Sequence, residues 1–199
     1  MVKAAGNSRL NFVTTKGIVV FLAGKTDWDA SVMRWGLVPS WWKDASKLPI
    51  QTFNARAGTL AEKPTFRAAF KRRRCLILCD GFYEWKARGE KAKQPFFIHP
   101  ADPQGILHFA GVWDNWETAD GAMESCTIIT TEPNALMAGI HNRMPVVLSP
   151  EHFDEWLDPA NQDTARPQHL LLPCEPALLE AYSVGPVRGD GPELLTPIT

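Results

Sequence analysis

A single carboxylate stands among aromatic residues just after a predicted tight turn. The segment is Cys79-Asp80-Gly81-Phe82-Tyr83-Glu84-Trp85-Lys86, and its Asp-Gly pair predicts the turn. If the rings of Tyr83 and Trp85 exclude water from Glu84, the pKa of its carboxyl rises towards the range useful for general acid and base catalysis. The alternative is an alternating strand that turns Glu84 to solvent. Periodicity alone does not separate these two interpretations.

Two other segments place an arginine two residues after a polar side chain. They are His141-Asn142-Arg143 and Asn54-Ala55-Arg56. In an extended chain residues i and i+2 share a face, so both members of each pair point to one side. A guanidinium placed in this way suits an anion such as phosphate. His141 taken alone is equally consistent with a purely structural histidine.

The aromatic content is high, with eight tryptophans among 199 residues. Trp41 and Trp42 are adjacent in a loop bounded by proline, so an extended chain cannot point both rings into one core. An exposed indole there would serve as a platform that stacks on bases or wedges between them. The basic run Lys71–Arg74, with Arg67 one turn earlier, would suit phosphate chemistry, or it is a solvated helix end.

The four cysteines show no metal or disulfide pattern. If their segment is a strand, Cys75 and Cys79 lie roughly 13 Å apart, which is too far to share one zinc ion. No second pair of ligands accompanies them. We therefore expect reduced, buried thiols, no metal and no cofactor. A hydrolase with Cys79 as nucleophile and His141 as base is a separate hypothesis.

Composition and charge are those of a globular domain. The 199 residues are 45% hydrophobic and carry a formal net charge of -1, which excludes disordered, collagen-like and coiled-coil classes. The apolar run Ile18–Ala23 is too short for a membrane span or a secretory signal. We expect one domain over residues 1–199, a cytoplasmic location, no membrane partner and a monomer.

Short strands must position most of the candidate site residues. Apolar or β-branched runs predict strands at 17–22, 75–79, 95–98, 107–113 and 125–130. Short helices are expected at 64–70, near 134–139, and after Ser149-Pro150-Glu151, where Ser149 would be the N-cap. Beyond Asp158 irregular chain is expected. The pattern predicts an α+β single domain with a mixed or antiparallel, barrel-like β-sheet core and short flanking helices.

Taken as a set, these segments resemble the SOS-response-associated peptidase (SRAP) family, abasic-site processing proteins that shield damaged single-stranded DNA by covalent capture. The shared motifs follow the family's order along most of the chain. They are Trp35-Gly36-Leu37-Val38-Pro39-Ser40-Trp41-Trp42, Asn54-Ala55-Arg56-Ala57, Arg74-Cys75-Leu76-Ile77, Asp80-Gly81-Phe82-Tyr83-Glu84-Trp85, Lys93-Gln94-Pro95-Phe96, Ile140-His141-Asn142-Arg143-Met144-Pro145 and Asp190-Gly191-Pro192-Glu193-Leu194.

The resemblance implies a barrel-like fold with a DNA cleft and three catalytic residues. Glu84 would promote opening of the abasic deoxyribose ring and transfer protons. His141 would assist that transfer and orient the sugar. Asn54 would position the reacting terminus and the substrate. These roles agree with the residue types, because a reaction between an amine and a carbonyl needs an acid or base nearby.

The resemblance also implies a set of DNA contacts. Two arginines would bind phosphates, two indoles would stack on or displace bases, and one hydroxyl would contact the DNA backbone. These residues are Arg56, Arg143, Trp41, Trp42 and Thr130. The expected partner is single-stranded DNA that contains abasic sites.

The N-terminus departs from the family pattern. Family chains begin Met-Cys-Gly-Arg, and the exposed cysteine supplies the amine and the thiol that close the abasic aldehyde into a thiazolidine. This sequence begins Met1-Val2-Lys3-Ala4, and Gly58 stands where the family has an acidic residue. We therefore expect recognition and processing of abasic sites in the DNA-damage (SOS) response, with peptidase and lyase-like activity implied by the family, and a covalent step that lacks its thiol. The alternatives are a non-catalytic binder of single-stranded or damaged DNA and the Cys/His hydrolase.

Overall fold

The computed structural model describes residues 17–23, 28–44, 46–49, 52–89, 92–118, 121–188 and 191–198. The five predicted strands are confirmed, within a few residues at each end. They correspond to β1 (Gly17–Ala23), β4 (Arg74–Cys79), β6 (Ala92–Pro100), β7 (Leu107–Thr118) and β8 (Gly121–Thr131).

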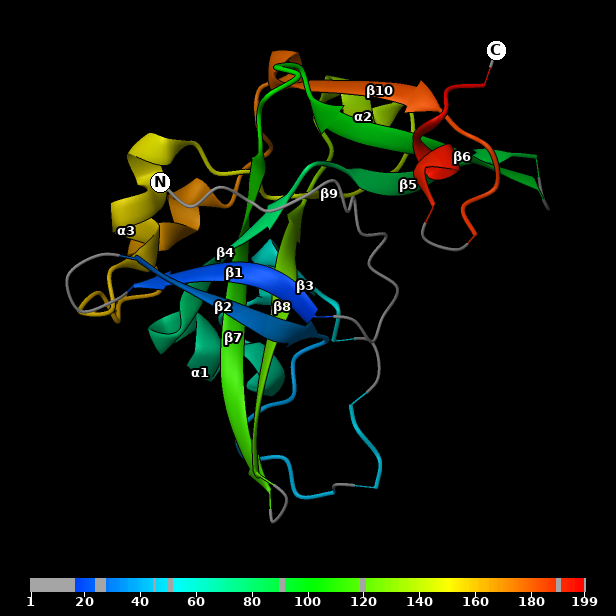
Figure 1. Ribbon diagram of the computed structural model, residues 1–199. Helices are drawn as coiled ribbons and strands as arrows, with labels where there is room; N and C mark the ends of the chain where they lie inside the picture. The colour runs from blue at the N-terminus through cyan, green and yellow to red at the C-terminus, as the bar shows by residue number, and fades with distance from the viewer. Residues whose placement is uncertain are drawn as a thin grey trace.

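A closed ring of strands forms the centre of the molecule (Figure 1). β2 (Trp28–Trp35) is added to β1, and the strand order is β2-β1-β4-β7-β8. A parallel pairing of Arg34 and Trp35 with Ser125 and Cys126 joins β2 to β8 and closes the ring. Closure leaves these strands few free edges, and the predicted mixed, barrel-like sheet is confirmed.

Two short strands extend β8 where it passes the end of β2. β3 (Asn54–Arg56) runs parallel to β8, opposite Ile128–Thr130, and β9 (Met144–Pro145) pairs antiparallel with the last residues of β8. β8 therefore collects segments that are far apart in the sequence. Two of the segments singled out for chemistry lie beside it.

A second sheet has the order β10-β6-β5 and lies above the barrel in Figure 1. β5 (Phe82–Arg88) leaves β4 through the Asp80-Gly81 turn, and β10 (Leu179–Ser183) comes from the C-terminal region, where only irregular chain and short helices were expected. Gly81 is required in this turn, because a Cβ there would lie 2.4 Å from the ring of Phe97 and 2.5 Å from the carbonyl oxygen of Ile98.

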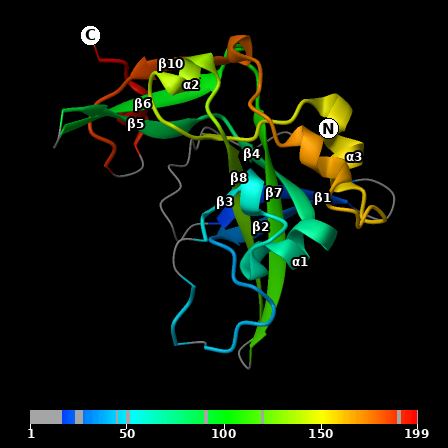
Figure 2. The same cartoon turned by 180° about the vertical axis from the view of Figure 1, so that it is seen from behind.

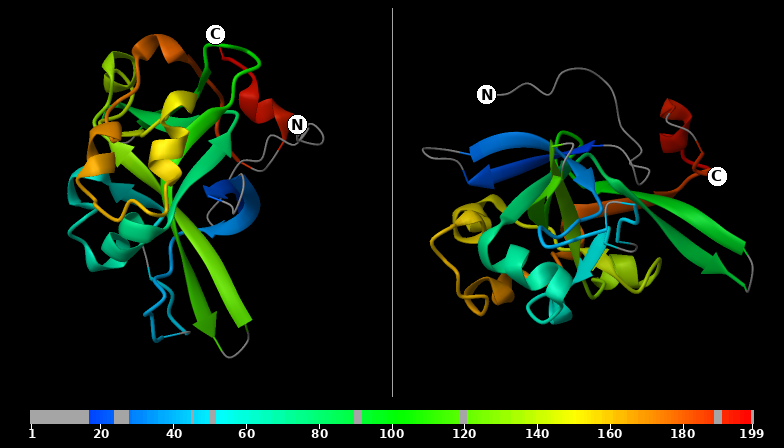
Figure 3. Two further views of the ribbon diagram at one scale, coloured as in Figure 1. Left: turned by 90° about the vertical axis from the view of Figure 1, so that its left-hand side faces the viewer. Right: turned by 90° about the horizontal axis from the view of Figure 1, so that it is seen from below.

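Short helices cover the barrel. α1 (Pro64–Arg72) lies across one side (Figure 2), and β1 and β2 form the opposite side (Figure 3). α2 (Ala135–Ala138) lies beside the second sheet, and α3 (Phe153–Leu157) follows a 3₁₀ turn at Pro150–His152. Ser149 stands at the expected N-cap, but its side chain makes no capping hydrogen bond, because the chain enters the helix through this 3₁₀ turn.

Arg74 belongs to the core and not to the exposed basic run in which the sequence places it. Its guanidinium donates to the carbonyl oxygens of Phe70, Trp156, Asp158 and Asn161. Burial lowers the pKa of Arg74. The side chain therefore fixes the ends of two helices, while Lys71 and Arg72 remain exposed.

No helix of the described residues has the length and apolar character needed to cross a membrane.

Candidate functional site

The face of β8 that points away from α1 and α3 carries the first part of the site. Ala55 and Ile129 are paired and buried in the hydrophobic cluster that these two helices cover. Their neighbours on β3 and β8 must point the other way, because side chains alternate along a strand. This alternation places Asn54, Arg56, Ile128 and Thr130 together on the opposite face.

Arg143 reaches the same face from the segment that precedes β9. One of its terminal nitrogens donates to the carbonyl oxygen of Thr130 over 2.7 Å. Its Nε is buried and has no hydrogen-bond partner among the described residues. Burial and the neighbouring charge of Arg56 lower the pKa of Arg143. A bound anion would lower the repulsion between the two guanidinium groups and could accept a hydrogen bond from the Nε of Arg143, so the pair suits a phosphate.

Glu84 faces His141 across the gap between the two sheets. Its Oε2 lies 3.8 Å from the Nδ1 of His141, and the Glu84 side chain is 25% exposed. Burial raises the pKa of the Glu84 carboxyl, and the charges of His141 and Lys93 oppose that rise without cancelling it. Of the two interpretations of this segment, the structure supports the partly desolvated carboxylate.

The end of α2 fixes His141. Asn134 caps the helix by accepting a hydrogen bond from the backbone N–H of Met137, and the N–H of His141 donates to the carbonyl oxygen of Met137. The backbone N–H and C=O of Arg143 both lie 3.2 Å from the imidazole Nδ1. Nδ1 therefore accepts from the N–H in the tautomer that carries its proton on Nε2, and donates to the C=O when Nδ1 itself is protonated.

The two adjacent tryptophans play different parts in their loop. Trp41 is 50% exposed, whereas the indole N–H of Trp42 donates to the carbonyl oxygens of Asp44 and Lys47. The two rings are tilted against each other with centroids 5.9 Å apart. Trp42 thus supports Trp41, which offers its ring to the solvent.

Asp114 and Trp116 of β7 hold this loop in place. Asp114 accepts from the backbone N–H of Ser40 and forms an ion pair with Arg73 at 2.9 Å, and the indole of Trp116 donates to the carbonyl oxygen of Trp42. Sequence reasoning missed both residues. A signal was present, because Asp114 directly follows an apolar strand run where a carboxylate must find partners.

The predicted site residues therefore form two groups. Five of them lie around one end of β8 and the gap to β5: Arg56, Glu84, Thr130, His141 and Arg143, with Asn54 on the same face of β3. Trp41 and Trp42 belong to the other group. Their loop is tied near Ser125, which accepts from the N–H of Val38. Five residues of strand separate Ser125 from Thr130, or roughly 17 Å at about 3.3 Å per residue.

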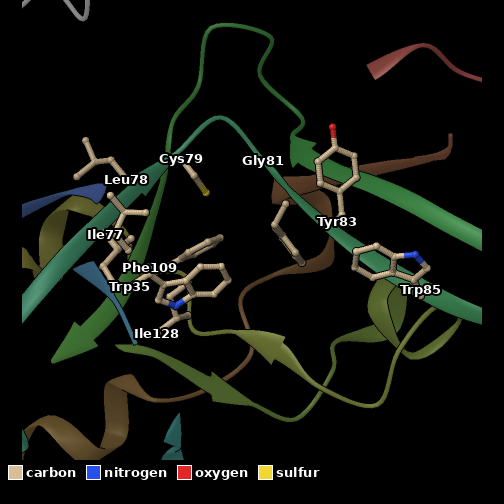
Figure 4. A pocket seen from close by; sticks show the side chains of 11 residues that line it. Trp35, Ile77, Leu78, Cys79, Gly81, Tyr83, Trp85, Phe109 and Ile128 are labelled. Atoms are coloured by element: carbon tan, nitrogen blue, oxygen red, sulfur yellow. The ribbon is translucent and has the colours of Figure 1, made fainter. Parts of the chain in front are cut away.

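An apolar cavity of about 200 Å³ lies between the barrel and β5 (Figure 4). Its walls come from all five barrel strands, the Asp80-Gly81 turn and β5. They are formed by Ile18, Trp35, Ile77, Leu78, Cys79, Gly81, Phe82, Tyr83, Trp85, Phe109 and Ile128. The described residues contain no group of three or more His, Cys, Asp or Glu side chains that could hold a metal ion.

All four cysteines are free thiols. Burial raises the pKa of each, to about 11 for Cys174 and to about 12 for Cys126. The thiols are therefore protonated at neutral pH.

Comparison with known proteins gives a consistent result. The family model for the SOS response associated peptidase (SRAP) matches residues 2–188. The chain is 44% identical over 168 residues to the abasic site processing protein YoqW of Bacillus subtilis (strain 168), covering 82% of this chain and 74% of YoqW. It is 39% identical over 191 residues to the abasic site processing protein HMCES of Gallus gallus, which covers 83% of this chain but only 56% of HMCES.

Solved structures share the fold. A crystal structure of a protein from Bacteroides thetaiotaomicron superposes with a TM-score of 0.84 at 29% sequence identity, covering 94% of this chain and 83% of the other. A protein from Bordetella bronchiseptica gives a TM-score of 0.75 at 26% identity, covering 85% of this chain and 84% of the other. Each superposition covers more than four fifths of both chains.

Proposed function

We propose that this chain, which belongs to the SOS response associated peptidase (SRAP) family, recognises and processes abasic sites in single-stranded DNA as part of the DNA-damage response. The observation that carries the proposal is the pairing of Glu84 with His141 at 3.8 Å, beside a face that presents Arg56 and Arg143. An abasic strand offers phosphates to the two arginines and an aldehyde to the acid and base. The names of the relatives, as abasic site processing proteins, support this assignment.

In the proposed reaction Glu84 acts first as an acid. With its pKa raised by burial, the carboxyl keeps its proton at a higher pH than a solvated carboxyl would. It donates that proton to the ring oxygen of the abasic deoxyribose, while His141 takes the proton of the C1′ hydroxyl. The C1′–O bond of the ring breaks and the aldehyde forms. Asn54, on the same face as Arg56, orients the sugar.

Capture of the aldehyde requires an amine. Attack of an amine on C1′ forms a C–N bond, and one nitrogen proton moves to the carbonyl oxygen to give the carbinolamine. Glu84, reprotonated by the proton that His141 took, protonates the carbinolamine hydroxyl, which leaves as water. The remaining N–H proton of the iminium returns to Glu84, which gives the imine. The resemblance to the family assigns this amine to the N-terminal residue, and Met1 and Val2 lie outside the described residues. Neither of these two residues carries a thiol. An adduct on the α-amine of either residue is a reversible imine, which decays by hydrolysis or by lyase-type strand scission.

Two other functions were open at the level of sequence. A binder without chemistry would use the same arginines and indoles, and the absence of a thiol at position 2 keeps it as the second candidate. The Cys/His hydrolase is disfavoured, because the raised pKa of Cys79 leaves its thiol protonated and a thiolate is the nucleophile in such enzymes. We further propose that the protein acts as a cytoplasmic monomer and that any peptidase activity uses the same Glu84–His141 pair.

A denaturing gel separates these functions. The protein is mixed with abasic and intact single-stranded oligonucleotides, with and without borohydride, which reduces an imine to a stable amine. We expect a cross-linked band only with abasic DNA and only after reduction. Native-gel binding without any trapped band would support the non-catalytic binder. A stable band without reductant would contradict the reversible imine, and a Val2→Cys variant should produce that band.

A further inference from the structure

The cavity beside β5 is not used by the chemistry described above. Figure 4 shows Trp35 and Phe109 on one side, side chains of β5 on the other, and the sulfur of Cys79 turned into the space between them. The cavity holds about 200 Å³. Pockets for drug-sized ligands are typically about 300 to 1,000 Å³, so this one admits a single small ring system.

We propose that this cavity binds one unstacked nucleobase, that of the nucleotide next to the abasic site. The inference rests on the proposed function, since it assumes that abasic single-stranded DNA lies across Glu84 and Arg143. In this assignment the apolar walls of the cavity bind the base. Glu84 and His141 contact the sugar, and Arg56 and Arg143 bind the phosphates.

The position of the cavity supports this assignment. Phe82 lines it two residues before Glu84 on β5, and Ile128 lines it two residues before Thr130 on β8. Two residues of strand span about 6.6 Å, roughly twice the 3.4 Å rise between stacked nucleotides, and one nucleotide covers about this distance once it is unstacked and its backbone is extended. A sugar held at Glu84 therefore places the next base, once unstacked, at the mouth of the cavity.

The walls provide aromatic surface and no charge. The rings of Phe82 and Phe109 pack edge to face with centroids 5.6 Å apart. The indole N–H of Trp35 is already bonded to the carbonyl oxygen of Phe53, so this ring offers only its apolar surface. The Cys79 thiol is neutral, because burial raises its pKa. Such walls bind the face of any base with little selection by sequence.

An abasic site lowers the free energy needed to unstack the neighbouring base and move it into the cavity. A base inside an intact strand loses two stacking neighbours when it is extruded, whereas a base next to an abasic site has only one to lose. Extrusion costs least for damaged or single-stranded positions. A cavity for the neighbouring base would therefore favour abasic strands over intact ones before any covalent step.

A cycle of two changes tests the cavity. One change removes the base: the strand carries a tetrahydrofuran abasic analogue, which has no aldehyde, and the neighbouring position on the 5′ or the 3′ side is either a thymidine or a second analogue. The other change fills the cavity: Cys79→Leu adds bulk, and Cys79→Ser is the matched control of similar size. Binding is measured by fluorescence anisotropy at one salt concentration.

In the wild type and in Cys79→Ser, we expect removal of the neighbouring base on one of the two sides to weaken binding about 5- to 100-fold, the range of one stacked base. In Cys79→Leu the loss should fall below about twofold. Affinity of Cys79→Leu for the doubly abasic strand should equal that of the wild type, which shows that the variant is folded. An equal loss in all three proteins, on either side, would overturn the inference.

A second measurement needs no variant. Wild-type protein is irradiated with a strand that carries 5-iodouracil next to the abasic analogue, and the cross-linked peptide is identified by mass spectrometry. We expect the cross-link in the peptide that contains Cys79 and Phe82 or in that of Trp35. Cross-links confined to Trp41 and Trp42 would refute the cavity assignment and leave the proposed function standing. If the wild type fails to bind any single strand, the proposed function itself fails.

Discussion

The acid–base cluster and the tryptophan loop lie at two ends of β8 and are built in different ways. Around Thr130 the side chains converge because strands from distant parts of the chain meet there and alternate their faces. Near Ser125 a loop with little regular structure is held by hydrogen bonds: Ser125 and Asp114 accept from its backbone N–H groups, and Trp116 donates to one of its carbonyl oxygens. Most residues of the proposed acid–base cluster therefore stand on or beside strands, whereas the exposed ring of Trp41 stands on an anchored loop.

This difference has a functional consequence. An acid and a base must keep their positions within fractions of an ångström, whereas a stacking ring needs only to be presented. If the two regions act independently, a change in one should leave the function of the other intact. The predictions below test that separation, from the largest expected effect to the smallest.

Replacing Glu84 with glutamine should produce the largest change. The amide keeps the shape of the side chain but cannot deliver a proton, so we expect imine formation to fall about 10²- to 10⁴-fold with binding to single strands within about twofold of the wild type. Single-turnover trapping by borohydride gives the rate, and anisotropy gives the affinity. Full reactivity of Glu84→Gln would make the residue structural.

His141→Ala should act on the same step. If Glu84 and His141 function as a pair, as we propose, the double variant should be about as slow as the slower single variant. Multiplied effects in the double variant would show that the two residues serve separate steps, and would contradict the pairing at 3.8 Å as a catalytic unit.

The tryptophan loop should respond to Trp116→Phe. The resemblance to the family implies a preference for single-strand/duplex junctions, on which an exposed indole would stack. The change keeps a buried ring and removes only the N–H that donates to Trp42, so we expect a looser Trp41 and a loss of about 1 kcal/mol in this preference. The trapping rate on single strands should not change. Competition between junction and single-strand oligonucleotides measures the preference.

Trp156→Phe is the matched control for that experiment. Trp156 is also buried, and its indole donates to the carbonyl oxygen of Cys75 in the core. Its replacement should lower the free energy of unfolding and leave junction preference unchanged. If both variants lose the preference equally, the effect of Trp116 is one of general stability and the loop has no separate role.

How much of this could be read from the sequence depended on the range of the interactions. Four of the five barrel strands were visible because their apolar runs and turns are local, and the fold class followed from them. β2 was not predicted, because half of its side chains are exposed and it has no apolar run. The orientation of Glu84 was not visible, since it depends on His141 and on the Asp80-Gly81 turn, which meet only in the folded chain. Arg74 was placed on the surface for the same reason, because its carbonyl partners come from α3 and beyond.

The phosphate contacts should give a smaller and more uniform effect. Arg56→Gln and Arg143→Gln should each weaken binding to all strands alike and reduce the slope of log affinity against log salt by about one unit or slightly less. Arg67→Gln, on the exposed part of α1, is the control and should leave the slope unchanged. A salt series by anisotropy decides between them, and an equal change for all three would indicate a diffuse electrostatic attraction.

The smallest effect concerns pH and the stability of the cluster. Burial raises the pKa of Glu84 above its usual value near 4.5, so the folded protein holds this proton more tightly than the unfolded chain does. The folded state therefore gains most from Glu84 at low pH, where the carboxyl is neutral in both states. That gain declines as the pH rises from the unfolded pKa through the raised one, and above it the buried charge costs stability.

Replacing Glu84 with glutamine abolishes this titration. The difference in unfolding free energy between the variant and the wild type should therefore grow in favour of the variant over this pH window and then level off. Urea unfolding at a series of pH values measures that difference, and Trp116→Phe should show the pH dependence of the wild type, because the tryptophan loop takes no part in this titration. A constant difference between Glu84→Gln and the wild type at every pH would mean that Glu84 titrates as a solvated carboxyl, which would remove the physical basis for its role as the acid.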